Sequence, residues 1–594
     1  MVNGVSRPAM PSLFEPGRIG PVALRNRLIM APMTTRAADA EGFVTEDLLA
    51  HYRARAEGGV GLVTVEMASP ERAGKHRNFE LGIYDERFLP GLTRLAETVH
   101  AAGAKAAIQL GHGGGHTRVD IAGVTPVAPS AIPHSVQEGH TEVIVPEEMS
   151  LARVAEAIEA FAAAARRAER AGFDAVEIHA AHGYLISQFL APFENRRTDR
   201  YGGPLDNRTR LGNEIVRAVK AAVPHLAVIF RMNGDDFFEG GLTGDEAVRV
   251  AAQAVEAGAD AIHVTGGHYR SQPTAAIMIP PMATTPTPFA GFARRIRERV
   301  PVPVVTVGRY GDPRDAARAL SEGTADFVAL GRPLLADPLW VEKAARGETV
   351  RLCVACNTCV DGMRAGERLH CYVNPRTGRE LDWAGRKLRR RGQRIAVIGA
   401  GPAGLTYAAE AAADNDVTVF EREMDVGGAF RLAGLAPRFQ GVEARPDTLI
   451  AFVEGLASRS RELGAAIELG TDPVENPSRL EGFDHVVIAT GASYPAGLGW
   501  TVDTALRSGL FRRSPLRPIA ERDDVRDWFY YRARSATGET VKARLPTGIS
   551  AETIGDALAP GKGDAAIMSA FQAAYASEPE FLGPGRPRRL EVAA

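Results

Sequence analysis

Cysteine is scarce in this chain and is confined to one short stretch. The 594 residues include only four cysteines, and all of them lie between Cys353 and Cys371. A disulfide framework spreads its cysteines through a sequence, so this pattern argues against disulfide-stabilised domains and against an oxidising compartment. Four thiols gathered this closely predict instead a shared role in one site.

Long apolar runs and a strong charge imbalance are also missing. No window reaches the roughly 18 consecutive apolar residues that a membrane helix needs, and the N-terminal segment has no signal-peptide core. The formal net charge is −2, and the basic run 386–391 is most simply a solvated linker between motifs. We therefore expect a large, multidomain cytoplasmic protein without nucleic-acid or membrane partners.

The first part of the chain repeats a short apolar run, a polar turn and a helical pattern. Eight candidate strands lie at 27–32, 60–67, 105–112, 175–181, 227–233, 261–267, 302–308 and 327–332. Parallel strands need helical crossovers, so this repeat predicts an α/β fold in which residues 1–350 form a (β/α)8 TIM barrel. The chemistry of such a barrel lies at the C-terminal ends of its strands.

Arginines stand at three of those strand ends. Gly308–Arg309 and Gly331–Arg332 close the last two strands, where barrels often bind a phosphate, so these pairs predict a phosphorylated cofactor. The alternative is that both arginines form ordinary salt bridges on the rim. Arg231 ends another apolar strand and would otherwise be a buried unpaired charge, so it requires an anionic partner such as a reduced flavin ring.

The fourth predicted strand runs into a cluster of three polar rings. His179 and His182 are three residues apart, and Tyr184 follows two residues later. Two neutral imidazoles can hold one carbonyl oxygen and draw electrons from a conjugated C=C bond, while a phenol protonates the carbon beside the carbonyl. A lone histidine or tyrosine would more often be a packing residue, so this prediction depends on the spacing and the position.

The cysteine stretch contains Cys353, Cys356, Cys359 and Cys371. Zinc usually takes separated Cys-x2-Cys pairs, whereas three closely spaced thiolates and one more distant one suit the corners of a cubane cluster. We therefore expect segment 351–392 to hold a [4Fe–4S] cluster that relays electrons. Structural zinc and buried free thiols are the alternatives.

Residues 393–594 open with a strand, a glycine turn, a helix and a second strand. Gly399, Gly401 and Gly404 form a dinucleotide fingerprint, and Glu421 ends the second strand, where a carboxylate binds ribose hydroxyls. This context predicts a Rossmann-like domain that binds FAD or ADP.

The same region resembles the FAD-binding domains of flavoproteins that bind two dinucleotides. That resemblance implies nucleotide contacts from Gly428 and Asp556. Such domains carry a second glycine fingerprint for NAD(P)H, but residues 493–549 contain none. We expect this NAD(P)H domain to be missing and predict an amphipathic helix from the charged, aromatic segment 521–539. Ala429 stands where such domains usually have a glutamine after the paired glycines. The ligand of this site is therefore either whole FAD or ADP alone.

Several motifs together resemble the old yellow enzyme family of FMN-dependent ene-reductases. They are MAPMTTR from Met30, IQLGHGG from Ile108, HAAHGYLISQFL from His179, NRRTDRYGG from Asn195, FRMNGDDF from Phe230 and LGRPLLADP from Leu330. With the cysteine stretch behind them, the resemblance narrows to the multidomain branch of 2,4-dienoyl-CoA reductase, trimethylamine dehydrogenase and NADH:flavin oxidoreductases. It extends over most of residues 10–495.

The resemblance also implies residue roles. Tyr184 would be the proton donor, and His179 and His182 would hold the substrate oxygen. The FMN contacts would be Ala31, Pro32, Met33, Thr34, Gln109, Arg231, Gly308, Arg309, Gly331 and Arg332. The amine dehydrogenases of this branch have a tyrosine at the position of His179 and a cysteine that tethers FMN. No cysteine precedes Cys353 here, which excludes covalent FMN and disfavours an amine substrate.

These signals predict an oxidoreductase that transfers hydride between FMN and a small α,β-unsaturated carbonyl compound. Electrons would pass through the cluster to the second nucleotide site. Two alternatives are an amine dehydrogenase or demethylase that passes electrons to a flavoprotein partner, and a non-catalytic electron-transfer subunit. Segments 113–150 and 268–289 are expected to form apolar pocket walls, and the protein is expected to be a homo-oligomer.

Overall fold

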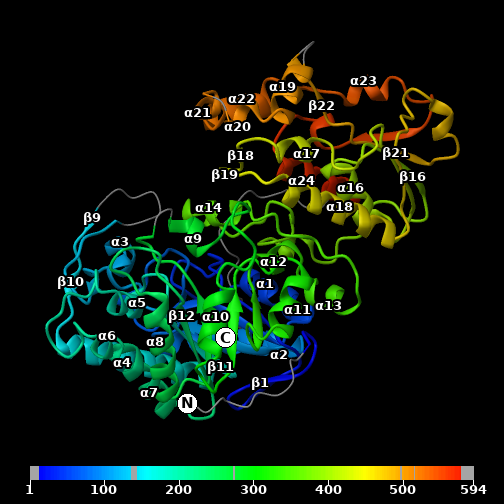
Figure 1. The fold of residues 1–594 in the computed structure, drawn as a ribbon. Coiled ribbons are helices and arrows are strands. Elements are labelled where there is room, and N and C mark those ends of the chain that lie inside the picture. The colour runs from blue at the N-terminus through cyan, green and yellow to red at the C-terminus, as the bar shows by residue number, and fades with distance from the viewer. Residues whose placement is uncertain (1–11, 136–142, 272–273, 495–497, 514, 577–594) are drawn as a thin grey trace.

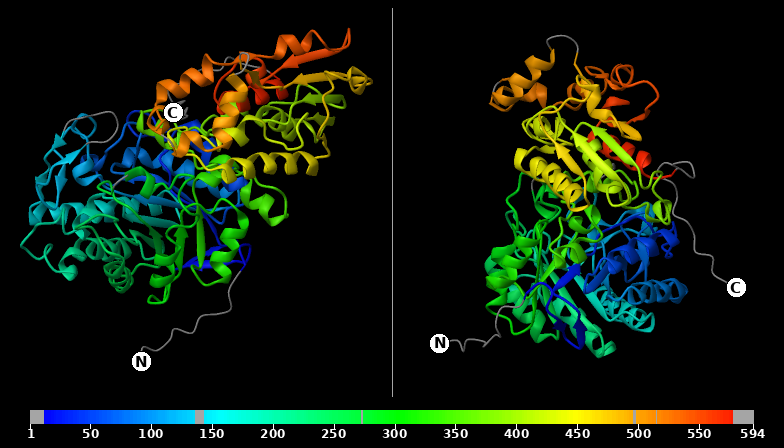
Figure 2. Two further views of the ribbon diagram at one scale, coloured as in Figure 1. Left: turned by 45° about the horizontal axis from the view of Figure 1, so that its top comes forward. Right: turned by 90° about the vertical axis from the view of Figure 1, so that its right-hand side faces the viewer.

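The computed structural model describes residues 12–135, 143–271, 274–494, 498–513 and 515–576. The chain forms a barrel from its first part and a smaller domain from its last part, which lies over one end of the barrel (Figures 1 and 2). None of the described helices is both long and apolar enough to span a bilayer.

Eight parallel strands build the barrel, and all eight were predicted. They are β3 (Leu28–Met30), β4 (Leu62–Ser69), β6 (Lys105–Leu110), β11 (Ala175–Ala180), β12 (Ala227–Asn233), β13 (Ala261–Thr265), β14 (Val304–Val307) and β15 (Phe327–Leu330). Each strand pairs in parallel with its neighbour, and β3 pairs with both β15 and β4, which closes the barrel. The predicted TIM barrel is therefore confirmed.

Helices follow the strands and bury their apolar faces against the barrel. The longer ones are α1 (Glu46–Glu57), α2 (Leu89–Ala101), α4 (Leu151–Arg170), α7 (Arg210–Ala222), α8 (Gly244–Glu256), α10 (Ala290–Arg297) and α11 (Pro313–Ser321). Side-chain caps mark where some of them begin. Thr243 and Glu246 form a reciprocal capping box at the start of α8, which satisfies backbone N–H groups that have no partner within the helix.

The strand register places the polar residues of the barrel at matched levels. His179 on β11 lies opposite Arg231 on β12, which lies opposite His263 on β13. Two residues earlier on β11, Glu177 lies opposite Gln109 on β6. Residues two apart on a strand point to the same face, so Glu177 and His179 share one side of the sheet.

The segment 351–392 joins the two domains and includes α14 (Thr358–Arg364) and α15 (Glu380–Trp383). It is tied to the second domain through a buried carboxylate. Arg351 and Arg376 donate hydrogen bonds of 2.6 and 2.9 Å to the two carboxylate oxygens of Glu410. Burial alone would raise the pKa of Glu410, but these charges lower it to about 2, so the carboxylate stays ionised.

A five-stranded parallel sheet forms the centre of the second domain. Its order is β20 (Ala466–Glu468), β17 (Asp416–Phe420), β16 (Arg394–Ile398), β21 (His485–Ile488) and β24 (Ser550–Thr553). The main helices are α16 (Pro402–Ala411), α18 (Pro446–Glu462) and α24 (Gly563–Ala574). The Rossmann-like fold expected from the glycine fingerprint is confirmed.

A shortened connection leads from this sheet to its last strand. It contains β22 (Ala492–Ser493), α19 (Leu498–Arg507), α20 (Leu510–Arg513), α21 (Arg517–Ala520), α22 (Asp523–Tyr531), β23 (Ser535–Ala536) and α23 (Gly538–Lys542). Its described residues form no second parallel sheet, in agreement with the missing NAD(P)H domain. The helix predicted over 521–539 is correct only for α22, because the chain then leaves the helix to pair β23 with β22.

Candidate functional site

A cavity of about 460 Å³ opens at the C-terminal ends of the barrel strands. The structure brings every barrel residue of the predicted site to this cavity. Those lining residues are Ala31, Pro32, Met33, Thr34, Gln109, His179, His182, Tyr184, Arg231, Gly308, Arg309, Gly331 and Arg332. The size is in the range of cofactor and ligand pockets, about 300–1,000 Å³.

The two arginines at the last strand ends have no carboxylate partner in the described part of the chain. Arg309 donates to the carbonyl oxygens of Pro281 and Met282 at 3.0 and 3.1 Å, and Arg332 donates to that of Pro280 at 2.7 Å. Burial and the charge of Arg332 lower the pKa of Arg309 to about 10, which still leaves Arg309 charged at neutral pH. Rim salt bridges therefore do not account for these residues, and the site suits an anionic phosphate.

Arg231, predicted to need an anionic partner such as a reduced flavin ring, has a protein carboxylate beside it. Arg231 Nη1 lies 3.6 Å from Glu177 Oε1, and Glu177 is also hydrogen-bonded at 2.7 Å to both Gln109 and His263. Glu177 could not be singled out from the sequence, because it lies within an apolar strand and only the cross-strand register shows what it faces. Arg231 Nε nevertheless makes no hydrogen bond, so one buried donor remains for a ligand.

His179 and His182 lie beside each other at the end of β11. Their ring centroids are 5.2 Å apart and their planes are perpendicular. Burial above all, with nearby positive charge from Arg231, holds the pKa of each well below its ordinary value, so both imidazoles are neutral. His179 Nδ1 has no hydrogen-bond partner, whereas His182 Nε2 lies 3.1 Å from Thr265 Oγ1.

The phenol of Tyr184 takes part in a hydrogen-bonded group that the sequence did not reveal. Its oxygen lies 3.1 Å from His76 Nε2 and 3.0 Å from the Tyr269 hydroxyl. Arg77 in turn donates to the Tyr269 hydroxyl at 2.8 Å. Burial raises the pKa of Tyr184 well above 10, so the phenol keeps its proton. His76, Arg77 and Tyr269 come from distant loops and belong to no motif.

The expected pocket walls are correct for only one of the two segments. Residues of 268–289 line the cavity, among them Met278, Ile279 and Pro280, whereas none of the described residues of 113–150 does. A third wall comes from the second domain, through Thr448 and Ala451 of α18. Residues of both domains therefore line the cavity.

The four cysteines surround a small second cavity of about 10 Å³. All are free thiols, and Cys353 and Cys359 also line the large cavity. Two non-glycine residues in this loop, Ala355 and Asn357, have positive φ angles of 49° and 60°. A backbone held in this strained form, with four thiols converging, suits a group ligated by sulfur.

The glycine fingerprint forms a tight turn with one open position. A Cβ on Gly399 would lie 2.4 Å from Ala489 O, and one on Gly404 would lie 2.0 Å from Gly399 O. A Cβ on Gly401 would meet nothing within 4 Å, so Gly401 faces open space where a phosphate can approach. Gly428 packs against it, since its Cβ would lie 3.3 Å from Gly401 Cα.

The two acidic residues predicted to bind the second nucleotide are engaged with protein groups. Glu421 Oε2 accepts a hydrogen bond of 2.8 Å from the Ala400 N–H at the glycine turn. Asp556 Oδ2 accepts one of 2.6 Å from Arg534, which lies in the shortened connection. Arg534 could not be predicted from the sequence as a partner of Asp556, because the two are 22 residues apart and Arg534 belongs to no motif.

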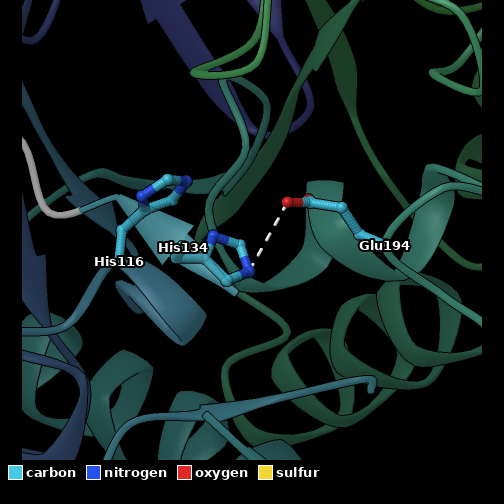
Figure 3. A group of neighbouring side chains, drawn as sticks. All are labelled: His116, His134 and Glu194. Atoms are coloured by element: carbon cyan, nitrogen blue, oxygen red, sulfur yellow. Dashed lines mark ion pairs between the residues drawn. The ribbon is translucent and has the colours of Figure 1, made fainter. Parts of the chain in front are cut away.

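A second group of buried side chains lies outside the cysteine stretch. Figure 3 shows His116, His134 and Glu194. One ring nitrogen of each histidine and one carboxylate oxygen of Glu194, the atoms that could bind a metal ion, all lie within 4.8 Å of one another. Arg270 already donates to Glu194 Oε1 at 2.6 Å, and His268 Nε2 lies 3.1 Å from Oε2. Burial alone would lower the pKa of His268, but the Glu194 carboxylate raises it. These positive charges balance Glu194, so the group is an ion-pair network and disfavours a divalent cation.

This geometry defines a barrel enzyme with an anion-binding site for a flavin cofactor and an adjoining Rossmann-like domain. Comparison with known proteins identifies the same two parts of the chain. Residues 12–350 match the NADH:flavin oxidoreductase / NADH oxidase family, and residues 397–439 match the NAD(P)-binding Rossmann-like domain. The chain therefore belongs to the NADH:flavin oxidoreductase / NADH oxidase family and is an FMN-dependent oxidoreductase.

The similarity to individual proteins extends beyond the barrel. The chain is 37% identical to the NADH oxidase of Thermoanaerobacter brockii over 490 residues, which cover 81% of this chain and 73% of that protein. It is 41% identical to a metal reductase of Desulforamulus reducens over 494 residues, 81% of this chain and 71% of the relative. A 2-naphthoyl-CoA reductase structure shares the fold, with a TM-score of 0.80, 23% identity and coverage of 95% and 99% of the two chains.

Proposed function

We propose that this protein transfers hydride between FMN and a small α,β-unsaturated carbonyl compound, with Tyr184 as the proton donor. The observation that carries the proposal is the placement of His179, His182 and Tyr184 around the same cavity as the predicted FMN contacts. Bound FMN supplies hydride chemistry that no side chain can provide. Arg309 and Arg332 would hold its phosphate, and Gln109 and Arg231 would contact its ring.

The protein side chains are suited to the remaining tasks. Neutral His179 and His182 can donate N–H groups to one carbonyl oxygen, which polarises the conjugated bond. The uncharged phenol of Tyr184 can then give its proton to the α-carbon. The apolar side chains of Met278, Ile279 and Pro280 line the same cavity and favour an apolar substrate.

We also propose that Cys353, Cys356, Cys359 and Cys371 hold a [4Fe–4S] cluster, which would supply one-electron transfer. Its cavity adjoins the FMN cavity, since Arg332, Cys353 and Cys359 line both. The glycine turn at Gly401 would bind FAD or ADP. Because the described connection contains no second dinucleotide fold, we propose that a redox protein partner exchanges electrons near this second site.

The direct test is an anaerobic assay of the purified protein, supplied with FMN and a low-potential reductant. We expect it to reduce 2-cyclohexen-1-one to the saturated ketone, and a Tyr184→Phe variant to do so much more slowly. Reduction of the flavin by an N-methylated amine, without any enone turnover, would favour the amine dehydrogenase. A response to neither compound would favour an electron carrier.

A further inference from the structure

The proton donor of this site is buried beside a second, unassigned set of groups. His76 and Glu80 lie in the loop that follows β4 and are 5% and 3% exposed, while Tyr184 is 6% exposed. His76 Nε2 lies 3.1 Å from the Tyr184 oxygen, and His76 Nδ1 lies 2.8 Å from Glu80 Oε2. The three side chains therefore form a continuous row from the cavity into the protein.

The partners define which atom of His76 can exchange a proton with Tyr184. A carboxylate has no hydrogen to offer, so the Glu80 oxygen 2.8 Å from Nδ1 favours the form of His76 that carries a hydrogen on Nδ1. Nε2 is then the atom that faces the phenol. Glu80 is itself held in place, because Oε2 also accepts hydrogen bonds of 3.0 and 3.1 Å from the backbone N–H groups of His76 and Arg77.

Tyr184 needs such a neighbour because it cannot easily be left as a phenolate. The site is buried, and a charged phenolate there would lose its hydration. Phenols titrate near about 10 and imidazolium near about 6.5, so an imidazolium is the better proton source at neutral pH than a second phenol such as Tyr269. The Glu80 carboxylate supplies a counter-charge for that imidazolium. Other titratable groups nearby are Glu66, Lys75, Arg77, His179 and Tyr269.

We propose that His76 is the proton relay that resupplies Tyr184 and that Glu80 positions and charge-balances it. The inference rests on the proposed role of Tyr184 as donor. As the Tyr184 O–H bond breaks, a C–H bond forms at the α-carbon of the substrate, whose enolate supplies the electron pair. The His76 Nε2–H bond breaks as a new O–H bond forms on Tyr184. Neutral His76 then takes a proton from water, so no further reductant is consumed.

The test compares His76→Gln, His76→Ala, Tyr184→Phe and wild type in the anaerobic 2-cyclohexen-1-one assay, in H2O and D2O. Glutamine keeps a hydrogen-bonding amide but cannot relay a proton. We expect kcat of His76→Gln to fall about 10- to 100-fold, with KM little changed and a larger solvent isotope effect. Added imidazole should restore much of the rate to His76→Ala and none to Tyr184→Phe. FMN content of each variant shows whether the barrel is intact.

The outcomes separate the relay from the function on which it rests. Wild-type rate and isotope effect in His76→Gln, together with a slow Tyr184→Phe, would overturn the relay and leave the donor in place. Wild-type turnover in Tyr184→Phe would remove the donor assignment and the relay with it. A merely structural role for His76 would lower FMN content in both His76 variants and give no rescue by imidazole, which would also overturn the proposal.

Discussion

Glu177 and Arg231 form a buried ion pair across two neighbouring barrel strands, with Oε1 3.6 Å from Nη1. Glu177 is 1% exposed and also accepts a hydrogen bond from His263. Burial alone would raise the pKa of Glu177, but His263 and Arg231 lower it, so the carboxylate is ionised. One carboxylate thus holds two side chains at the base of the FMN cavity.

The first prediction concerns this pair. Glu177→Gln leaves Arg231 buried without its counter-charge, and removing one partner of a buried pair costs about 3–5 kcal/mol. We therefore expect a lower thermal midpoint of the barrel and weaker FMN retention, measured by calorimetry and flavin fluorescence. Glu256→Gln, at an exposed position on α8, is the matched control and should change stability by less than about 0.5 kcal/mol. Equal stability of the two variants would show that Arg231 is compensated elsewhere.

The second prediction concerns Tyr184. Tyr184→Phe should slow enone turnover about 10²- to 10⁴-fold, the usual contribution of a positioned general acid. Because burial raises the pKa of Tyr184 above its ordinary 10, the phenol remains protonated below that pH, and its ionisation should limit turnover only above pH 10. A titration of the phenolate absorbance in wild type and variant checks this, because it follows the phenol separately from His76. A phenolate signal that forms near pH 8 in wild type and is missing in Tyr184→Phe would contradict it.

The third prediction concerns the cysteine cavity. Protein prepared anaerobically should contain about four irons and four acid-labile sulfides per chain. Cys356→Ala should lose them yet keep FMN, because the flavin site is built from barrel strand ends. Metal and sulfide analysis together with flavin content measures both. Zinc in place of iron would support the structural alternative.

The same variant tests the electron route. If electrons pass through the cluster to a redox partner, Cys356→Ala should lose activity with the physiological donor or acceptor and keep enone reduction with dithionite. Rapid reduction of its flavin by NADH, at the rate of the intact protein, would instead show that NADH acts directly in the barrel.

The fourth prediction uses two glycines of the same turn. Gly401→Ala meets open space and should fold normally but weaken ADP or FAD binding by about tenfold, since its methyl group occupies the approach of the phosphates. Gly404→Ala would place a Cβ 2.0 Å from Gly399 O and should unfold the second domain. Calorimetric titration with ADP and limited proteolysis distinguish the two effects. Gly455→Ala, inside α18 with space around it, is the control and should bind ADP normally. Unchanged ADP affinity in Gly401→Ala would place the nucleotide elsewhere.

The architecture, and the strand ends at which chemistry is expected, could be predicted from local patterns in the sequence. Short apolar runs followed by helical patterns predicted the eight barrel strands, and the spacing of Gly399, Gly401 and Gly404 predicted the Rossmann turn, because these features depend only on local sequence patterns. The residues singled out at strand ends line one cavity, since a closed parallel barrel brings all such ends to one rim.

Which groups face each other at these strand ends depends on the folded structure and could not be predicted. Glu177 meets Arg231 through the register between β11 and β12, and His76 reaches Tyr184 from 108 positions away. Arg534 reaches Asp556 through the folding of the shortened connection. These contacts depend on how strands pair and where loops cross the barrel mouth, and no local periodicity records that. The charge balance of the site, and with it the state of each proton, therefore follows from the folded barrel.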